Sequence, residues 1–375
     1  MPAGRRDVHS SAVTRVAYFV SAHGFGHAAR ASAVMAELRR RCPAIHFEIF
    51  TEVPKWFFSE SLPRCFSYHR IATDVGLVQT SPLTEDLDAT VEALDHMWHD
   101  NGAVEQLAGR LRELRCSVAV VDISPFGLAA AAAASLPSIL IENFTWDWIY
   151  AEYHDAPARL RAHGRNLADV FATAGLRIQT DPVCQPVPGA ETVPPVARVP
   201  KLDRAQVRAK LDLPSDGAMV VVSMGGVPWD YRMFSDGRSS KGPWIVIPGG
   251  AERRFERRER LILLPFHAQV YHPDLVAASD IVVGKLGYST VAETYRAGAR
   301  LCYVGRLKFP ESPVLARWVN RRMVAAEITE DELRNGAWLA AAEGLLKKPR
   351  RMPEDPNGAM RAVDAILERF ESHLD

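Results

Sequence analysis

Residues 21–30, SAHGFGHAAR, place two histidines and an arginine in a glycine-rich turn. Gly24 and Gly26 permit a tight strand-to-helix turn, and the N–H groups that open the following helix can bind an anion. His27 stands in the first turn of that helix, where the helix dipole disfavours an imidazolium. A neutral imidazole can accept a proton, so we interpret His27 as a candidate general base. The alternative is a histidine that only caps the helix or packs.

Asp122 ends the apolar run at 118–122, VAVVD, at the same sheet edge that presents His27. Its carboxylate would hydrogen-bond the imidazole, fix the tautomer and stabilise the protonated form during proton transfer. The alternative is that Asp122 only caps the helix that follows the strand.

Aromatic residues are concentrated in residues 142–155, ENFTWDWIYAEYHD. Aromatic faces stack on sugar rings and apolar acceptors, although the same residues can equally form core beneath a long loop. If this stretch is a site, Asn143 and Asp147 supply its polar contacts. We predict that five residues bind the acceptor, meaning the substrate molecule that would receive a transferred group. They are His23, Arg30, Asn143, Trp146 and Asp147.

The second half of the chain repeats the glycine turn after an apolar run. In VVVSMGGVP, the run that ends at Ser223 leads into Gly225 and Gly226, whose bare backbone can approach a diphosphate. One glycine pair is weak evidence alone, but a second glycine loop follows further along the chain.

That second loop lies in residues 280–304, where an apolar run ends in glycine and Ser289 and Thr290 open the next helix. Hydroxyls and N–H groups at a helix N-terminus suit phosphate oxygens. Glu293, one turn further on, could accept from both hydroxyls of a ribose. As structure alone, Ser289 or Thr290 would be an N-cap and Glu293 its capping-box partner.

The elements that must position these residues alternate along the chain, which indicates a parallel α/β sheet. Continuous apolar runs such as VAVV and SILI suit a sheet covered on both faces. The predicted strands are 16–21, 46–51, 118–122, 138–142, 219–223, 244–247, 261–264, 280–283 and 301–304. The predicted helices are 27–41, 87–114, 127–135, 204–211, 289–297, 312–320, 330–346 and 357–372.

Proline divides the chain, because six of its 25 prolines lie in residues 180–202. Proline lacks a donor and fixes φ, so this stretch cannot be a central strand. We expect a loose tail at 1–14, a Rossmann-like domain at 15–180, a proline-rich linker at 181–203, a second Rossmann-like domain at 204–356, and a C-terminal helix at 357–375 that packs back on the first domain.

Composition excludes several classes of protein. Lysine plus arginine equals aspartate plus glutamate at 45 each, so no overall field attracts nucleic acid. The five cysteines show no CxxC spacing, which argues against a disulfide framework or a zinc site. No segment approaches the ~20 apolar residues of a membrane span. We expect a cytoplasmic protein. The basic run 252–260 is interpreted as a solvated face, and a peripheral membrane contact is the alternative.

These motifs together resemble the GT-B glycosyltransferases, in particular the inverting group of the N-acetylglucosaminyltransferase MurG and the UDP-glycosyltransferases. In that group the first turn ends in Gly-His, as Gly26 and His27 do here. The resemblance implies that this histidine deprotonates the acceptor and that an aspartate like Asp122 orients it. The amino-acid sequences of both glycine loops are also similar to part of L-arabinokinase-like proteins, but this sequence contains no sugar-kinase signature.

The second domain of that family carries a G-x-x-[ST]-x-x-E segment that binds phosphates and ribose, and residues 287–293 match it. A proline-containing turn near Phe266 resembles the segment that holds the base, and Glu311 resembles the residue that contacts sugar hydroxyls. Lys285 stands where retaining members have a glutamate, which favours inversion. The implied donor-binding set is Ser223, Gly225, Gly226, Phe266, Lys285, Gly287, Ser289, Thr290, Glu293 and Glu311.

The resemblance implies an α/β protein of GT-B fold, with two Rossmann-like, doubly wound parallel-sheet domains that face a central cleft. It implies transfer of a sugar from a nucleotide sugar, with UDP as the expected nucleotide, to a hydroxyl acceptor with inversion. We expect no cofactor and no obligatory metal, because the Asp-x-Asp sequence at 86–88 opens an acidic helix far from a strand end.

Three other functions stay open at this point, as does the oligomeric state. The same fold serves nucleotide-sugar epimerases and hydrolases. An NAD-dependent oxidoreductase would use residues 24–29 and Glu52, and a non-catalytic protein would only bind the nucleotide sugar.

Overall fold

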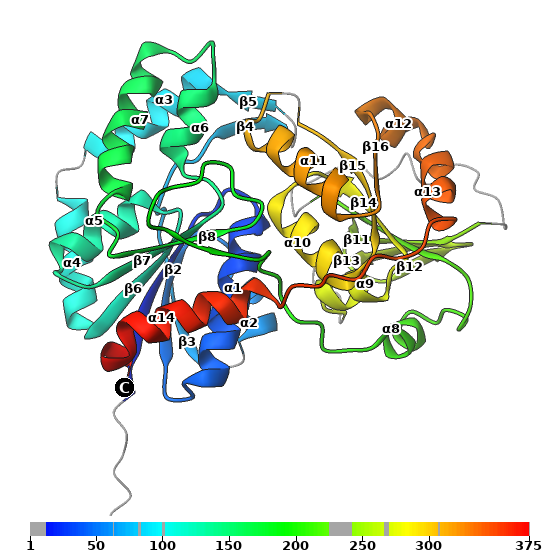
Figure 1. Cartoon of the computed structure of the whole chain (residues 1–375), viewed down its shortest axis with the longest axis horizontal. Coiled ribbons are helices and arrows are strands. Elements are labelled where there is room, and N and C mark those ends of the chain that lie inside the picture. Colours follow the sequence, from blue (N-terminus) through cyan, green and yellow to red (C-terminus); the bar gives the residue numbers. More distant parts are fainter. Residues whose placement is uncertain are drawn as a thin grey trace, which may run out of the picture.

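The computed structural model describes residues 13–62, 64–81, 84–99, 102–224, 242–265, 270–306 and 308–374. Within them the chain forms two α/β halves, each built on a seven-stranded sheet, which lie side by side in Figure 1. A two-stranded hairpin, β4 (Val78–Ser81) and β5 (Thr84–Asp86), projects from the first half toward the second.

The first sheet is wholly parallel, and its strand order reverses beside β1. In sheet order its strands are β3 (Phe66–Arg70), β2 (His46–Thr51), β1 (Arg15–Val20), β6 (Cys116–Asp122), β7 (Ser138–Glu142), β8 (Leu176–Thr180) and β9 (Glu191–Val193). In such a sheet a ligand crevice opens at the carboxyl ends of the strands where the order reverses. That point lies between the ends of β1 and β6.

Helices cover both faces of this sheet. They are α1 (Phe25–Arg41), α2 (Lys55–Ser61), α3 (Leu87–His99), α4 (Ala103–Glu113), α5 (Pro125–Ala133), α6 (Trp146–Glu152), α7 (Ala158–Phe171) and, from the end of the chain, α14 (Gly358–Leu374). Alternate residues of β1 enter different cores: Val16, Tyr18 and Val20 pack with α1, α2 and α14, while Ala17 and Phe19 pack with α3 to α7. The strand alternation thus fixes two apolar layers.

The second sheet repeats this plan with one antiparallel edge strand. Its order is β12 (Glu256–Arg258), β13 (Leu261–Pro265), β11 (Trp244–Ala251), β10 (Met219–Ser223), β14 (Ile281–Lys285), β15 (Arg300–Val304) and β16 (Ala325–Glu327), with β12 antiparallel to β13. Its helices are α8 (Arg204–Lys210), α9 (His272–Ala278), α10 (Tyr288–Ala297), α11 (Glu311–Arg322), α12 (Glu330–Asn335) and α13 (Trp338–Leu346).

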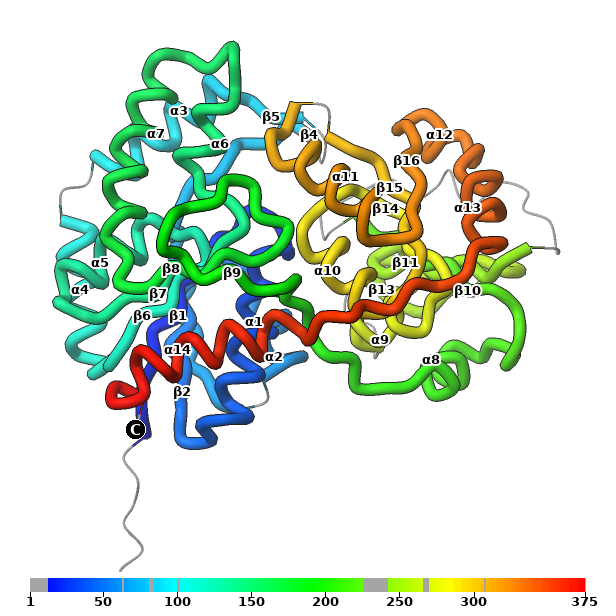
Figure 2. The backbone as a smooth tube through the Cα atoms, in the orientation of Figure 1, coloured from blue at the N-terminus to red at the C-terminus, as the bar shows by residue number. Residues whose placement is uncertain are grey.

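The chain crosses between the halves twice. Residues 194–203 lead from β9 to α8, and the segment before α14 returns, so that α14 lies along α1 of the first half (Figure 2). A hydrogen bond joins the two crossing segments, in which Asn357 Nδ2 donates to the carbonyl of Ala197 at 2.7 Å. At Gly358 a Cβ would lie 1.8 Å from the carbonyl oxygen of Pro194, so only glycine permits this close approach.

Several predicted elements differ from the structure. The helix expected at 87–114 is two helices, α3 and α4, with Gly102 as the N-cap of the second. The helix expected at 330–346 is also two, because Gly336 adopts a left-handed φ of 83° and ends α12. Strands β3, β8, β12 and β16 and the hairpin β4–β5 were not predicted, whereas β9 is a short strand inside the proline-rich stretch, which the sequence left open as an alternative there. Among the described residues no helix is both long and apolar enough to cross a membrane.

Candidate active site

His27 and Asp122 meet because β1 and β6 end side by side. Val20 pairs with Asp122 in the parallel ladder, and the turn after β1 brings α1 back over this edge. Gly24 makes that turn possible with a φ of 78°, a conformation that favours glycine. His27 Nδ1 then lies 2.9 Å from Asp122 Oδ1, with both side chains buried. The cap of α5 is Ser124, whose Oγ accepts from the N–H of Gly127, so Asp122 is not a helix cap.

Arg30 holds Asp122 from the other side. Its Nε donates to Oδ2 at 2.8 Å and its Nη2 donates to Oδ1 at 2.7 Å, while Nη1 donates to Asn143 at 2.7 Å. Burial alone would raise the pKa of Asp122, but the charge and hydrogen bonds of Arg30 hold it below its usual value. Asp122 is therefore a carboxylate, although it is fully buried.

This carboxylate selects the tautomer of His27. Nδ1 is the nitrogen that faces Asp122, so the proton lies on Nδ1 and the lone pair lies on Nε2. Arg30 Nη2 approaches the same Nδ1 at 3.2 Å, and since both groups are then donors, this is a contact rather than a hydrogen bond. His27 lines a cavity between the two halves, and in this tautomer Nε2 is the ring nitrogen that can accept a proton.

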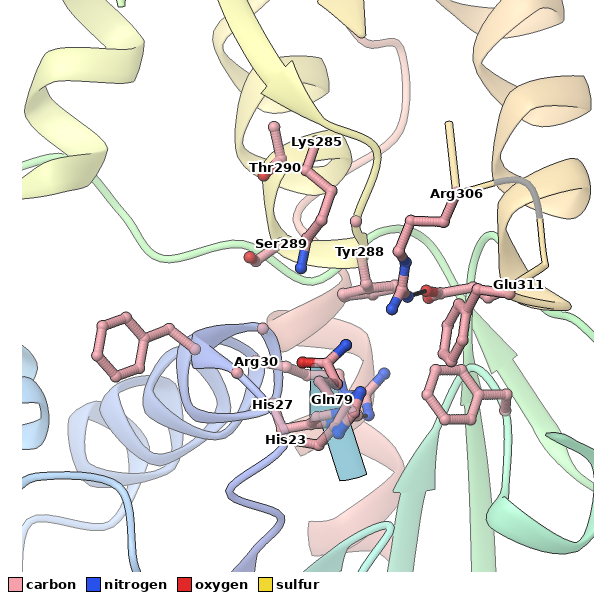
Figure 3. A pocket seen from close by; sticks show the side chains of 16 residues that line it. His23, His27, Arg30, Gln79, Lys285, Tyr288, Ser289, Thr290, Arg306 and Glu311 are labelled. Atoms are coloured by element: carbon pink, nitrogen blue, oxygen red, sulfur yellow. Dashed lines mark hydrogen bonds and ion pairs between the residues drawn. The ribbon is translucent and has the colours of Figure 1, made fainter. Parts of the chain in front are cut away.

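The opposite wall of the cavity is the N-terminus of α10. Its N-cap, Gly287, offers no side chain, and neither Ser289 nor Thr290 caps the helix. A Cβ placed on Gly26 would lie 3.8 Å from Ser289 Oγ, so the first turns of α1 and α10 face each other. Figure 3 shows Ser289 and Lys285 above His27 and His23. A cavity of about 60 Å³ lies between these walls.

Lys285, the last residue of β14, points into the same cavity. Burial lowers the pKa of its ammonium to about 7, and the positive charge of Arg306 adds to this effect. An anion in the cavity would favour the charged form.

Glu293 does not line this cavity. Arg198 donates from Nε to its Oε1 at 2.8 Å, and His272 Nδ1 lies 3.1 Å from its Oε2. Burial opposes its ionisation, but the charge of Arg198 and the contact with His272 bring the pKa of Glu293 down to about 2. The far nitrogen of His272 contacts Ser223 Oγ at 3.2 Å, so the two predicted donor residues meet through a histidine that we did not predict.

The predicted acceptor residues separate into three groups. His23 lines the cavity, and its pKa is lowered well below the usual value because it is buried and because Arg306 lies nearby. Arg30 and Asn143 are engaged with other protein groups, and Asn143 donates to Glu311 of the second half at 2.8 Å.

Trp146 and Asp147 lie elsewhere. Trp146 is fully buried and donates its indole N–H to Asp74 at 2.7 Å, so it packs in the core behind the cavity wall. Asp147 lines a separate cavity together with Arg161 and Arg165, and does not line the cavity of His27. Three predicted donor residues, Gly225, Gly226 and Phe266, lie outside the described residues.

Sequence reasoning also missed residues that line the cavity, namely Gln79, Tyr288, Arg306 and Phe309, and the two partners of Glu293, Arg198 and His272. Arg306 carried a signal, because only Gly305 separates it from the end of the apolar strand β15. The others follow turns or lie on elements whose position depends on how the two halves meet.

Comparisons with known proteins agree with this architecture. No protein-family model matches the chain. It is 30% identical over 330 residues to an L-arabinokinase of Arabidopsis thaliana, a match that covers 86% of this chain and 31% of that protein. The chain thus spans about a third of the length of this curated relative.

Solved structures of glycosyltransferases share the fold. MurG of Acinetobacter baumannii is 14% identical with a TM-score of 0.54, covering 95% of this chain and 99% of that one. The calicheamicin glycosyltransferase CalG4 is 17% identical with a TM-score of 0.61 (96% and 98% covered). An indoxyl-glucosylating UDP-glucosyltransferase of Polygonum tinctorium is 14% identical with a TM-score of 0.57 (96% and 98% covered). The predicted fold is therefore confirmed: the chain has the GT-B fold, in the form shared by MurG and the UDP-glucosyltransferases.

Proposed function

We propose that this protein is a glycosyltransferase that moves a sugar from a nucleoside-diphosphate sugar, with UDP as the nucleotide, to a hydroxyl acceptor with inversion and without a metal ion. The observation that carries the proposal is the pairing of His27 with Asp122 at 2.9 Å, directly across the cavity from the N-terminus of α10. One wall offers a base and the other offers a site for an anion.

The reaction follows from this placement. The acceptor O–H gives its proton to His27 Nε2 while its oxygen attacks the anomeric carbon from the face opposite the diphosphate. The bond from that carbon to the diphosphate oxygen breaks, and its electron pair leaves with the diphosphate. Asp122 stabilises the imidazolium that forms, and Arg30 keeps the carboxylate in place.

The leaving diphosphate is met by groups of the second half. The N–H groups that open α10, the hydroxyls of Ser289 and Thr290, and the ammonium of Lys285 would stabilise its charge. A divalent ion fills this role in metal-dependent enzymes. We therefore expect that EDTA leaves turnover unchanged.

The structural neighbours support the donor. One of them is a UDP-glucosyltransferase and others were solved with UDP bound. The relative named L-arabinokinase acts on a sugar by its name, but this chain matches 31% of it, so we do not assign kinase activity to this segment. UDP-L-arabinose belongs in the donor panel for that reason.

The first experiment is a thermal-shift panel of nucleoside diphosphates and their sugars. A ligand at about 100 times its Kd stabilises the native state by about 2.7 kcal/mol, which raises Tm measurably. We expect UDP and UDP-sugars to protect the protein. Protection by NADH instead would support the oxidoreductase, and ATP-dependent phosphorylation of a sugar would support a kinase.

The second experiment substitutes His27→Ala and follows release of UDP from UDP-sugars with hydroxyl acceptors. We expect turnover to fall by about 10²–10⁴-fold while UDP still protects, because only the base is lost. His154→Ala, at an exposed histidine of the same half, is the matched control. Conversion of a UDP-sugar to an epimer or to free sugar without any acceptor would favour the epimerase or the hydrolase.

A further inference from the structure

A set of polar side chains in the cleft is left unused by the chemistry described so far. Gln79 and Glu85 come from the hairpin β4–β5 of the first half, and Arg306 follows β15 of the second half. We name these residues the hairpin–Arg306 cluster. Gln79 and Arg306 line the same cavity as His27 and Lys285 (Figure 3).

The guanidinium of Arg306 is buried without being satisfied. Arg306 is 5% exposed and lies over the ring of Phe309, 3.3 Å from its centroid. Its Nη1 is 3.6 Å from Glu85 and its Nη2 is 3.5 Å from Glu311, distances longer than ordinary hydrogen bonds. Its Nε has no hydrogen-bond partner among the described residues.

The two hairpin residues share this property. Gln79 Nε2 and Glu85 Oε1 are both buried atoms that lack a hydrogen-bond partner within the described part of the chain. Buried polar atoms are paired in the large majority of cases, and those that are not need an explanation. Glu85 lies opposite Gln79 in the hairpin and faces Arg306 from behind the cavity wall, whereas Gln79, Arg306 and the carboxylate of Glu311 line the cavity itself. Unpaired donors on Gln79 and Arg306 beside the carboxylate acceptor of Glu311 are the complement of a ligand that both donates and accepts.

Hydroxyl groups have this dual character, whereas a carboxylate or a phosphate only accepts. The charges of the cluster also disfavour an anion, because Arg306 already faces the carboxylates of Glu85 and Glu311. Of the other cations that line the cavity, Arg30 is held by Asp122, and Lys285 is on the side of α10, where the diphosphate is expected.

We infer that the hairpin–Arg306 cluster binds the hydroxyl groups of a neutral sugar, and that the transferred sugar of this enzyme carries no carboxylate. The inference rests on the proposed function, since a sugar bound between His27 and Lys285 lies where the transferred sugar must lie. It adds that the first half of the molecule takes part in donor selection through the hairpin, so the sugar site is complete only when the two halves meet.

The test compares UDP, UDP-glucose and UDP-glucuronate, which differ in the sugar and in its C6 carboxylate, by calorimetric titration of the full chain. We expect UDP-glucose to bind at least about tenfold more tightly than UDP-glucuronate, because the carboxylate of the sugar would meet Glu311 in the cavity and the charge of Glu85 behind Arg306. UDP-galactose and UDP-L-arabinose test whether other neutral sugars share this advantage over UDP-glucuronate.

Two variants separate the hydrogen-bonding and the charge contributions. Gln79→Leu should weaken UDP-glucose by about three- to tenfold and leave UDP unchanged, because it removes one donor to the sugar. Glu85→Gln removes a negative charge and should narrow the preference for UDP-glucose over UDP-glucuronate. Thr80→Ala, at an exposed position of the same hairpin, is the control. It should change neither the affinity for UDP-glucose nor the preference for UDP-glucose over UDP-glucuronate.

Equal or tighter binding of UDP-glucuronate in the wild-type protein would overturn the inference while leaving the glycosyltransferase proposal intact. The inference would also be overturned if Gln79→Leu and Glu85→Gln bound UDP-glucose and UDP-glucuronate as Thr80→Ala does. An unchanged Tm without ligand would show that these variants are folded. If neither UDP nor any UDP-sugar binds, the proposed function fails, and the inference fails with it.

Discussion

Lys285 shows how burial can prepare a residue for a charged ligand. Its side chain ends in the cleft beside Arg306, and desolvation together with that positive charge outweighs the attraction of Glu311 and Glu85. With a pKa of about 7, the amine is about half protonated at neutral pH and largely neutral above pH 8. A diphosphate beside it would raise this pKa and charge it.

We predict that binding of UDP takes up a proton at pH 8, because the free protein holds Lys285 as a neutral amine and the complex holds it as an ammonium. Isothermal titration in buffers of different ionisation enthalpy should give an uptake of roughly one proton. The affinity should fall as the pH rises from 7 to 9, since the proton that must be bound becomes scarcer.

Two substitutions give this measurement its control. Lys285→Gln should abolish the uptake and flatten the pH dependence, whereas Lys308→Gln, at an exposed lysine nearby, should leave both unchanged. An uptake that persists in Lys285→Gln would assign the proton to another group and remove Lys285 from the phosphate site.

For single residues, the sequence predicted those that lie at the ends of central strands or in the turns that follow them. His27 and Asp122 were paired correctly because parallel strands present their carboxyl ends at one sheet edge. Arg198 and His272 were not found, since they act on Glu293 from the interdomain segment and from α9. His27 and Asp122 are as far apart in the sequence as Arg198 and Glu293, but Arg198 lies between β9 and α8, outside both sheets, so no strand end marks its position.

Among the helices and strands, α14 follows the second half in the sequence but packs in the core of the first half. Ala362, Val363 and Ile366 are fully buried and pack in the core that contains alternate residues of β1. The amphipathic pattern predicted this helix, while its place beside α1 depends on a crossing that only Gly358 permits.

We predict that Ile366→Ala lowers the free energy of unfolding by about 2–5 kcal/mol, because it leaves a cavity in a core shared with the first sheet. Met360→Ala, on the exposed side of the same helix, should stay within about 0.5 kcal/mol. Urea unfolding followed by circular dichroism measures both. Equal effects of the two substitutions would mean that α14 does not form part of this core in solution.

The helix boundaries that we mispredicted have a common cause. In the sequence, asparagine precedes glycine at 101–102 and at 335–336. In the structure Gly102 is the N-cap of α4 and Gly336 is the C-cap of α12. Asparagine followed by glycine is a turn signal, which outweighed the periodicity. The missed strands lie at sheet edges or are only partly buried, as β3 and β16 are, so their apolar pattern is weak.

For the whole molecule, the size of the cleft raises the question of how a substrate enters. The cavity between the halves is about 60 Å³, whereas pockets for drug-sized ligands hold about 300–1,000 Å³. Contacts that join the halves close it, among them Asn143 with Glu311 at 2.8 Å and Ser61 with Tyr271 at 2.7 Å. Under the proposed function, a nucleotide sugar requires that the halves separate.

A disulfide across the cleft tests this separation, and Gly26 with Ser289 is the suitable pair. A Cβ at position 26 would lie 3.8 Å from Ser289 Oγ, so side chains at these two positions would be in contact across the cleft. In the double variant Gly26→Cys with Ser289→Cys, we expect oxidation to weaken UDP-sugar binding by more than about tenfold and dithiothreitol to restore it, because a locked cleft cannot admit the ligand. The single variants, which retain the native cysteines Cys42 and Cys184, should show no such dependence on redox state. Binding that is equally tight in the oxidised and the reduced double variant would show that the ligand enters without opening of the two halves.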